Sequence, residues 1–167
     1  KGEGGMVAVL GSTIEIIEKI FQENKNDLIA QIANDNSEGQ IVISGKNKDL
    51  AKLIEILKSN NIKNIKLPVS APFHCELMRP ATEVMKKEIT NTEFKKPNNP
   101  IVSNVTSTET LDPSQIKELL IKQIESPVRW RESIEYMILN GTDTFVEIGP
   151  GKVLSGLIKR INKEVKV

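Results

Sequence analysis

Residues 40–69 read QIVISGKNKDLAKLIEILKSNNIKNIKLPV, and this stretch sets the expectation for the fold. Residues 40–45 have the apolar, β-branched character of a strand that ends at a glycine. The next apolar residues are spaced i, i+3, i+4 and i+7, which predicts an amphipathic helix: Leu50, Leu53, Ile54 and Leu57. Residues 65–69 then read as a second strand. The stretch therefore predicts a strand–helix–strand unit.

The residues before this stretch repeat the same order. Residues 6–12, MVAVLGS, read as a strand, and Ser12 with Glu15 forms the S-x-x-E capping box of a helix. Residues 28–33 read as another strand, separated from residue 40 by a polar turn over 34–39. The order is βαββαβ, which is typical of a split-βαβ or ferredoxin-like unit. We therefore predict an α/β (α+β) fold whose residues 1–70 form a ferredoxin-like small subdomain.

Residues 71–167 contain more helix than strand. Two amphipathic helices are expected over 78–91 and 129–139, and a short strand over 101–105. A third helix begins with Pro113 at its first position after the cap residue Asp112, and runs to about Ile124. The last unit is a strand over 144–148, a glycine turn and a helix over 152–161, which is an α/β element. This half reads as part of a larger α/β layer structure.

Composition excludes several classes of protein. The 23 Lys and Arg residues nearly balance 22 Asp and Glu residues, so the overall charge gives no indication of a nucleic-acid or membrane partner. One histidine and one cysteine are too few for a zinc site, and no phosphate-binding glycine motif occurs. We expect a cytoplasmic protein with no metal and no cofactor. The N-terminus, KGEGGMVAVLG, lacks an initiator Met and a signal peptide, and we expect the chain to begin inside a larger protein.

The single histidine, His74, follows a Ser-Ala-Pro-Phe loop and precedes a helix, where a side chain can project into a cleft. Imidazole exchanges a proton near neutral pH, so His74 is a candidate general base, with a purely structural histidine as the alternative. Cys75 is adjacent, but neighbouring side chains in an extended loop point to opposite sides. We therefore expect a buried, inert thiol at Cys75 rather than a Cys–His pair.

No serine in the sequence has the context of a nucleophile. The strand–turn–helix motif G-x-S-x-G is missing from the sequence. Ser12 is assigned to a helix cap, Ser155 lies within a predicted helix, and Ser70 is in the same loop as His74. The base is thus present without a hydroxyl for it to activate.

Two further features could bind charged groups. The glycine turn at 149–151 with Lys152 opens a helix, so it could hold a phosphate or carboxylate, although a simple tight turn is the favoured interpretation. Several basic residues could contact an acidic partner or could merely keep a surface solvated: Lys159, Arg160, Lys63 and Lys66.

Four motifs occur in order: NDNSEGQIVISG (34–45), LPVSAPFHCELMRPA (67–81), IKQIESPVRWRESIEYM (121–137) and FVEIGPGKVLSGLIKRI (145–161). Together they resemble the malonyl-CoA:acyl carrier protein transacylases of bacterial fatty acid synthesis. The resemblance covers essentially the whole chain. It implies a ferredoxin-like subdomain inserted into an α/β-hydrolase-like subdomain, with residues 71–167 as the C-terminal part of the latter.

The resemblance also implies a catalytic mechanism. His74 is the expected base for a serine nucleophile, and Gln123 accepts a hydrogen bond that orients His74. The malonyl group would pass from coenzyme A to a serine ester and then to the phosphopantetheine thiol of acyl carrier protein. The family's serine elbow, its oxyanion-hole glutamine and its carboxylate-binding arginine lie upstream of the segment that matches this chain. The chain is therefore expected to be a fragment, inactive without the N-terminal half of the enzyme.

The resemblance suggests further roles and leaves alternatives. Lys159 and Arg160, with Lys63 as a weaker companion, are expected contacts for the acidic carrier protein. Asn36 and Ser37 match a family turn near the acyl site, although Glu38 replaces the usual proline, and Phe73 fits malonyl selectivity. Two other readings remain: a free-standing ferredoxin-like binding module, or a piece of an acyltransferase domain from a polyketide or fatty acid synthase.

Overall fold

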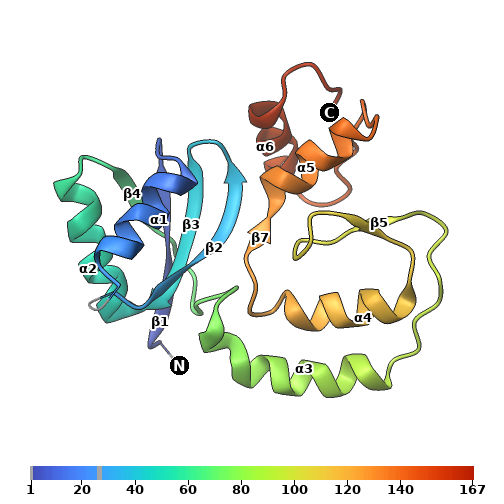
Figure 1. The fold of residues 1–167 in the computed structure, drawn as a ribbon, viewed down its shortest axis with the longest axis horizontal. Coiled ribbons are helices and arrows are strands. Elements are labelled where there is room, and N and C mark those ends of the chain that lie inside the picture. The colour runs from blue at the N-terminus through green and yellow to red at the C-terminus, as the bar shows by residue number, and fades with distance from the viewer. Residues whose placement is uncertain (1, 26–27) are drawn as a thin grey trace.

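The computed structural model describes residues 2–25 and 28–167, and Lys1, the first residue of the expected small subdomain, lies outside them. The described residues form a mixed α/β structure around a five-stranded sheet of order β4-β1-β3-β2-β7 (Figure 1). β1 lies antiparallel between β3 and β4, and β2 pairs antiparallel with β3. The strands are β1 (Gly4–Leu10), β2 (Ala30–Ser37), β3 (Gln40–Lys46), β4 (Lys63–Lys66) and β7 (Val128–Arg129).

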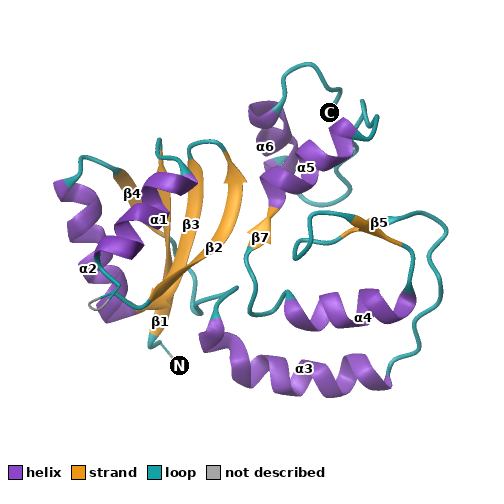
Figure 2. Cartoon of the chain, in the orientation of Figure 1, coloured by secondary structure: helices purple, strands orange, loops and turns teal. Residues whose placement is uncertain are grey.

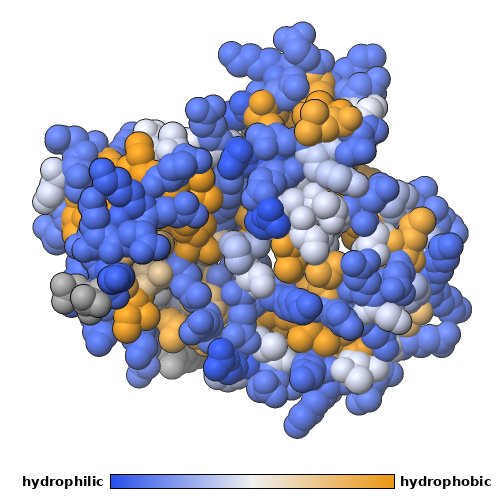
Figure 3. Space-filling view, in the orientation of Figure 1, coloured by the Kyte–Doolittle hydropathy of each residue, from blue (hydrophilic) through white to orange (hydrophobic). Residues whose placement is uncertain are grey.

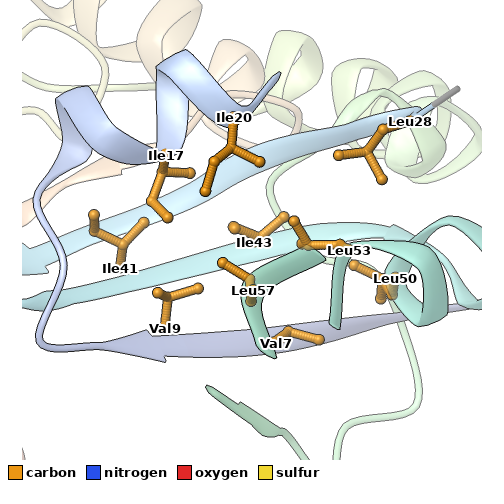
Figure 4. Close-up of a cluster of buried hydrophobic side chains, with 10 residues drawn as sticks. All are labelled: Val7, Val9, Ile17, Ile20, Leu28, Ile41, Ile43, Leu50, Leu53 and Leu57. Atoms are coloured by element: carbon orange, nitrogen blue, oxygen red, sulfur yellow. The ribbon is translucent and has the colours of Figure 1, made fainter. Parts of the chain in front are cut away.

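One face of this sheet is covered by α1 (Ile14–Glu23) and α2 (Asn47–Ser59). Alternate strand residues point to this face and meet the apolar sides of both helices, as Figure 4 shows. Ile17 and Leu53 come from the two helices and are completely buried. The full cluster is Val7, Val9, Ile17, Ile20, Leu28, Ile41, Ile43, Leu50, Leu53 and Leu57.

The opposite face of the sheet has a smaller apolar cluster, to which Leu67 adds from the chain after β4: Met6, Ala8, Ala33 and Val42. The loop that follows β4 crosses near the start of β1. A Cβ atom built on Gly4 would lie only 2.6 Å from Cγ of Pro72, so glycine is required at that position for the loop to approach this closely. The histidine loop is therefore packed against the sheet.

The second half of the chain is mainly helical (Figure 2). A 3₁₀ turn, η1 (Glu76–Met78), leads into α3 (Arg79–Asn91), which packs beside α4 (Pro113–Lys122). β5 and β6, residues Ile101–Val102 and Glu109–Thr110, form a small hairpin. β7 adds to the main sheet in parallel with β2, and then α5 (Trp130–Leu139) packs on α6 (Val153–Ile161). Among the described residues, no helix is long and apolar enough to span a membrane.

The order of elements expected over residues 6–69 is the order observed, but several boundaries are wrong. The polar residues after position 33 are not a turn, because β2 continues to Ser37 through irregular pairing with β3 and only Glu38 and Gly39 turn. β4 covers Lys63–Lys66 rather than 65–69, since the chain leaves the strand at Leu67. β5 and α4 also end earlier than expected.

The two predicted helix caps have opposite outcomes. Asp112 caps α4 as expected: its carboxylate accepts a hydrogen bond from the amide of Ser114, 3.0 Å away. The capping box at Ser12 is wrong. Thr13 is the N-cap residue of α1, and the Ser12 hydroxyl is buried without a hydrogen-bond partner in the described part of the chain. The sequence pattern placed the helix start one residue too early.

The strand predicted over 144–148 is also wrong. Apart from one isolated bridge between Thr144 and Lys166, no strand pairing involves this segment in residues 28–167. Val146 and Ile148 are 78% and 94% exposed. A strand needs a neighbour to satisfy its backbone, and beyond the bridge at Thr144 the described residues pair no strand with this segment.

Candidate functional site

His74 lies in the loop between β4 and η1 and is half-buried. Its backbone has a φ of 58°, which is the left-handed region that non-glycine residues rarely adopt. Such a conformation persists when surrounding contacts hold it, and it is common at functional sites. The backbone thus gives the first structural sign that this loop is specialised.

The imidazole of His74 contacts Gln123, as the sequence resemblance implied. The distance between Nδ1 of His74 and the backbone carbonyl oxygen of Gln123 is 3.0 Å. A carbonyl oxygen accepts hydrogen bonds and donates none, so Nδ1 must carry the proton in this contact. Nε2 of the neutral ring then has a free lone pair. This tautomer is the one required for Nε2 to act as a base.

The position of Gln123 explains why its backbone is available. Gln123 is the C-cap of α4, where carbonyl groups have no partner within the helix. The contact therefore does not depend on the glutamine side chain. The family resemblance indicated Gln123, but only the three-dimensional arrangement shows that its backbone carbonyl oxygen makes the contact.

Cys75 is buried, in agreement with the sequence expectation. Its thiol donates a hydrogen bond to the carbonyl oxygen of Pro72, with a distance of 3.1 Å between sulfur and oxygen. Burial raises the pKa of the Cys75 thiol. The reactive thiolate is therefore disfavoured at neutral pH, and the side chain fits a structural role better than that of a nucleophile.

The three serines that were weighed as nucleophiles have no hydrogen bond to His74 within the described chain. Ser12 is buried at the start of α1, and Ser70 is exposed in the same loop as His74. The hydroxyl of Ser155 donates to the carboxylate of Glu147.

The glycine turn before α6 does not present a free anion site. The carboxylate of Glu147 accepts hydrogen bonds from the amides of Leu154 and Ser155, at distances of 3.2 and 2.9 Å. These amides are at the helix N-terminus, where a ligand's negative charge would otherwise bind. The hydroxyl of Ser155 and these amides hold the pKa of Glu147 below its ordinary value. The interpretation as a tight turn is therefore favoured.

Two of the candidate basic residues lie at one end of the sheet. Lys63 pairs with Leu10, whose other neighbour is Gln40, and the side-chain oxygen of Gln40 accepts a hydrogen bond from Arg160. Two strand spacings of about 4.8 Å therefore separate the backbone of Lys63 from that of Gln40. Lys159 points elsewhere, because its ammonium group donates to the carbonyl of Val165.

The structure does not bring the turn residues Asn36 and Ser37 to His74. Gln31 contacts the loop just after His74, and Ser37 lies six residues further along β2, about 20 Å at the usual rise of a strand. Ser37 instead lines a cavity of about 180 Å³ beside Arg131 and Arg160. A direct contact of these two residues with an acyl group at His74 is therefore not favoured.

Two residues near the histidine were missed by sequence reasoning. The hydroxyl of Ser44 donates to the carbonyl oxygen of Phe73 over 2.5 Å, and the side-chain oxygen of Gln31 accepts from the amide of Glu76 over 2.8 Å. Ser44 lies within the first of the four motifs, which gave no sign of this contact, and Gln31 lies outside all of them. No local pattern marks such long-range contacts.

Comparisons with known proteins give a consistent picture. A profile of the acyl transferase domain family matches residues 1–166. The malonyl CoA-acyl carrier protein transacylase of Bacillus subtilis is 44% identical over 167 residues, which cover 99% of this chain and 53% of that protein. The crystal structure of the corresponding Clostridium perfringens transacylase superposes with a TM-score of 0.95 at 47% identity, covering 100% of this chain and 53% of that one.

A third relative was solved with a partner. It is a malonyl-transacylase in complex with a type II PKS acyl-carrier protein, and it matches with a TM-score of 0.93 at 34% identity. The match covers 99% of this chain and 54% of that chain. The present chain thus spans about half the length of the relatives that it matches.

Proposed function

The chain belongs to the acyl transferase domain family, and from that premise we propose that it supplies the histidine of a malonyl-CoA:acyl carrier protein transacylase. The observation that carries the proposal is the 3.0 Å contact between Nδ1 of His74 and the carbonyl oxygen of Gln123. It leaves Nε2 as the proton acceptor. The serine that this base would activate comes, in the proposal, from sequence outside these 167 residues.

In the proposed first half-reaction, Nε2 of His74 takes the proton of the serine hydroxyl as the serine oxygen attacks the thioester carbonyl of malonyl-CoA. The carbon–sulfur bond breaks, and coenzyme A leaves as a thiol with the proton returned by the imidazolium. In the second half, His74 takes the proton of the phosphopantetheine thiol, and the sulfur attacks the serine ester. The bond between the acyl carbon and the serine oxygen breaks, and the serine oxygen regains its proton from the imidazolium. Neither half requires a metal or cofactor.

The role of Gln123 in this scheme is to orient His74. Its carbonyl stabilises one tautomer and also favours the imidazolium form, because both keep a proton on Nδ1. Since the contact uses a backbone atom, we expect substitution of the glutamine side chain to matter less than a change in the position of the α4 C-terminus.

We also propose two subdomains with the bounds expected from the sequence, 1–70 and 71–167. The sheet order β4-β1-β3-β2 and the two helices on one face support a ferredoxin-like unit in the first. The second would be the C-terminal part of a larger α/β unit. Exposure of Val146 and Ile148 supports this, because apolar side chains of an ordinary free-standing module are mostly covered. The same observation disfavours the alternative of an independent binding module.

The carrier protein is the proposed macromolecular partner. A relative was solved in complex with an acyl-carrier protein, and Lys63 and Arg160 offer positive charge at one end of the sheet of this chain. Lys159 is a weaker candidate because its ammonium group is engaged by the carbonyl of Val165. Electrostatic contacts of this kind act mainly on the rate of encounter and are sensitive to salt.

The experiment that tests the function is a chimaera in which this chain replaces the matching half of the Bacillus subtilis relative. We expect the chimaera to transfer malonyl from coenzyme A to acyl carrier protein, and His74→Ala to reduce its turnover by about 10³-fold or more. Ser70→Ala, which removes an exposed hydroxyl from the same loop, is the control, and it should retain most of the turnover. Full turnover in His74→Ala, or stoichiometric acylation of the isolated chain by malonyl-CoA, would overturn the proposal.

A further inference from the structure

The left-handed backbone of His74 is held by contacts on both sides of the residue. The carbonyl oxygen of Phe73, in the peptide group before His74, accepts the hydrogen bond from Ser44. The amide of Glu76, two residues after His74, donates to Gln31. These two bonds fix the peptide groups at the ends of a segment that contains only His74 and Cys75.

The residues that make these bonds are direct neighbours in the sheet. Gln31 of β2 and Ser44 of β3 are register partners in the antiparallel ladder. Directly opposed residues in such a ladder point to the same face, so the two side chains leave the sheet side by side. One supplies a hydrogen-bond donor and the other an acceptor. Together they match the carbonyl and the amide that the loop presents.

We propose that Gln31 and Ser44 act as a two-point clamp on the loop and are positioning residues for the imidazole of His74. With both end peptides fixed, four backbone dihedrals remain between them, those of His74 and Cys75. Burial of Cys75 and its bond to Pro72 restrict these further. The clamp therefore directs Nδ1 to the carbonyl of Gln123. This inference deepens the proposed function, since it gives the small sheet a part in orienting the base.

The two bonds differ in their surroundings. Ser44 is completely buried, so its hydroxyl is shielded from water. The bond of Gln31 borders an open hollow of about 320 Å³ lined by both clamp residues, Cys75 and Glu76. A buried hydrogen bond whose partner is removed leaves an unsatisfied carbonyl, whereas water can replace a bond at the surface. We therefore expect Ser44 to contribute more than Gln31.

The test uses the isolated chain and requires no substrate. Because His74 is the only histidine in the sequence, its ring nitrogens give unambiguous signals in long-range ¹H–¹⁵N spectra. At a pH where the ring is neutral, the wild type should carry its proton on Nδ1. In the double variant Ser44→Ala with Gln31→Leu, we expect the ratio of Nδ1–H to Nε2–H tautomers to fall by about fivefold, the factor that corresponds to losing one net hydrogen bond.

Matched controls separate positioning from general destabilisation. Ser70→Ala removes an exposed hydroxyl from the same loop, and Gln31→Glu keeps an acceptor for the amide of Glu76. Both should keep the wild-type tautomer ratio. If the double variant loses its native amide dispersion, the two single variants are measured instead, with the larger change expected for Ser44→Ala.

The proposal is overturned if a variant without the clamp keeps native dispersion and an unchanged tautomer ratio, or if Ser70→Ala shifts the ratio equally. A loss of thermal stability alone does not move this ratio, so a merely structural role gives a different result. The outcome is also independent of the chimaera experiment. Failure of malonyl transfer there leaves the spectroscopic result on the loop intact.

Discussion

The N-terminal region, residues 2–66, and the C-terminal region, residues 101–167, differ in how well they cover their own apolar residues. In the N-terminal region two helices close one face of the sheet over a cluster of ten buried side chains. In the C-terminal region the described helices enclose a cluster of three such residues, Ile134, Ile158 and Val165. Several large apolar side chains there remain exposed, including Leu139, Val146 and Ile148.

Figure 3 shows apolar surface in both halves of this face of the molecule, and in the C-terminal region it lies around α4 and near the end of α5. The difference teaches that the N-terminal region buries most of its apolar residues in one core, whereas the C-terminal region leaves more of its large apolar side chains exposed. The candidate site at the junction depends on both regions. His74 illustrates this, because the N-terminal sheet anchors its backbone and α4 binds its ring.

The largest expected effect on stability comes from truncating one completely buried side chain in each apolar cluster. Leu53→Ala removes a completely buried side chain from the large cluster, and we expect a loss of about 3–5 kcal/mol in the free energy of unfolding. Ile134→Ala is equally buried but lies in the small cluster, where neighbours can relax, and about 2 kcal/mol is expected. Urea denaturation followed by circular dichroism measures both. Equal losses, or a larger loss for Ile134→Ala, would contradict the contrast between the regions.

An intermediate effect is expected at the ion pair that joins the two regions. Asp35 on β2 is buried, and its carboxylate lies 2.7 Å from the guanidinium of Arg131 on α5. Asp35→Asn leaves that partly buried guanidinium with only the more exposed Glu135 as a charge partner, at a cost of about 1–3 kcal/mol because Arg131 retains some exposure.

Glu135→Gln is the matched control for this substitution. It removes the more exposed carboxylate bound to the same arginine, and it should cost less than about 1 kcal/mol. Both values come from urea denaturation. If the two substitutions lower the free energy of unfolding equally, the burial of Asp35 does not strengthen its ion pair with Arg131.

The smallest effect concerns the helix cap within the C-terminal region. Hydrogen bonding lowers the pKa of Glu147 in the folded chain below its ordinary value of 4.5, with the Ser155 hydroxyl as the main cause. A depressed folded pKa means that the stabilisation is complete above 4.5 and is lost as the pH falls through the folded value. The amide signals of Leu154 and Ser155 should therefore titrate with a midpoint below 4.5.

Ser155→Ala removes the main cause of this depression, and so the midpoint should rise towards 4.5. The comparison is made by recording amide spectra of both proteins from neutral to acidic pH. A wild-type midpoint at or above 4.5, or a midpoint that Ser155→Ala leaves unchanged, would show that Glu147 does not cap α6 in solution.

The sequence predicted the N-terminal region well because its signals are local. The spacing of Leu50, Leu53 and Leu57 and the alternation in β1 and β3 each specify an element and the face that it buries. Prediction failed where the deciding contact is remote. β2 continues through polar residues that pair with β3 and, at Asn34 and Asp35, with β7. The carboxylate of Asp35 also binds Arg131, 96 positions away, and no pattern near Asp35 reveals these partners.

The strand prediction for residues 144–148 failed for a different reason. Its alternation of apolar residues has strand character, but strand formation requires a neighbouring backbone along its length, and the described residues provide only the bridge between Thr144 and Lys166. Ser12 shows a smaller version of the same limit. Its S-x-x-E pattern predicts a capping box, yet Thr13 is the N-cap residue of α1, and the hydroxyl of Ser12 is buried instead.

By itself, then, the sequence determined the order of the N-terminal elements, the family resemblance and the identity of His74 as the candidate base. Spacing and motif carry that information because both act over a few residues. The tertiary structure alone decided which atom of Gln123 meets the ring, that Glu147 fills the N-terminus of α6, and that Gln31 and Ser44 hold the loop. Hydrogen bonds depend on distance and direction in space, and residues far apart in the chain acquire these only when it folds.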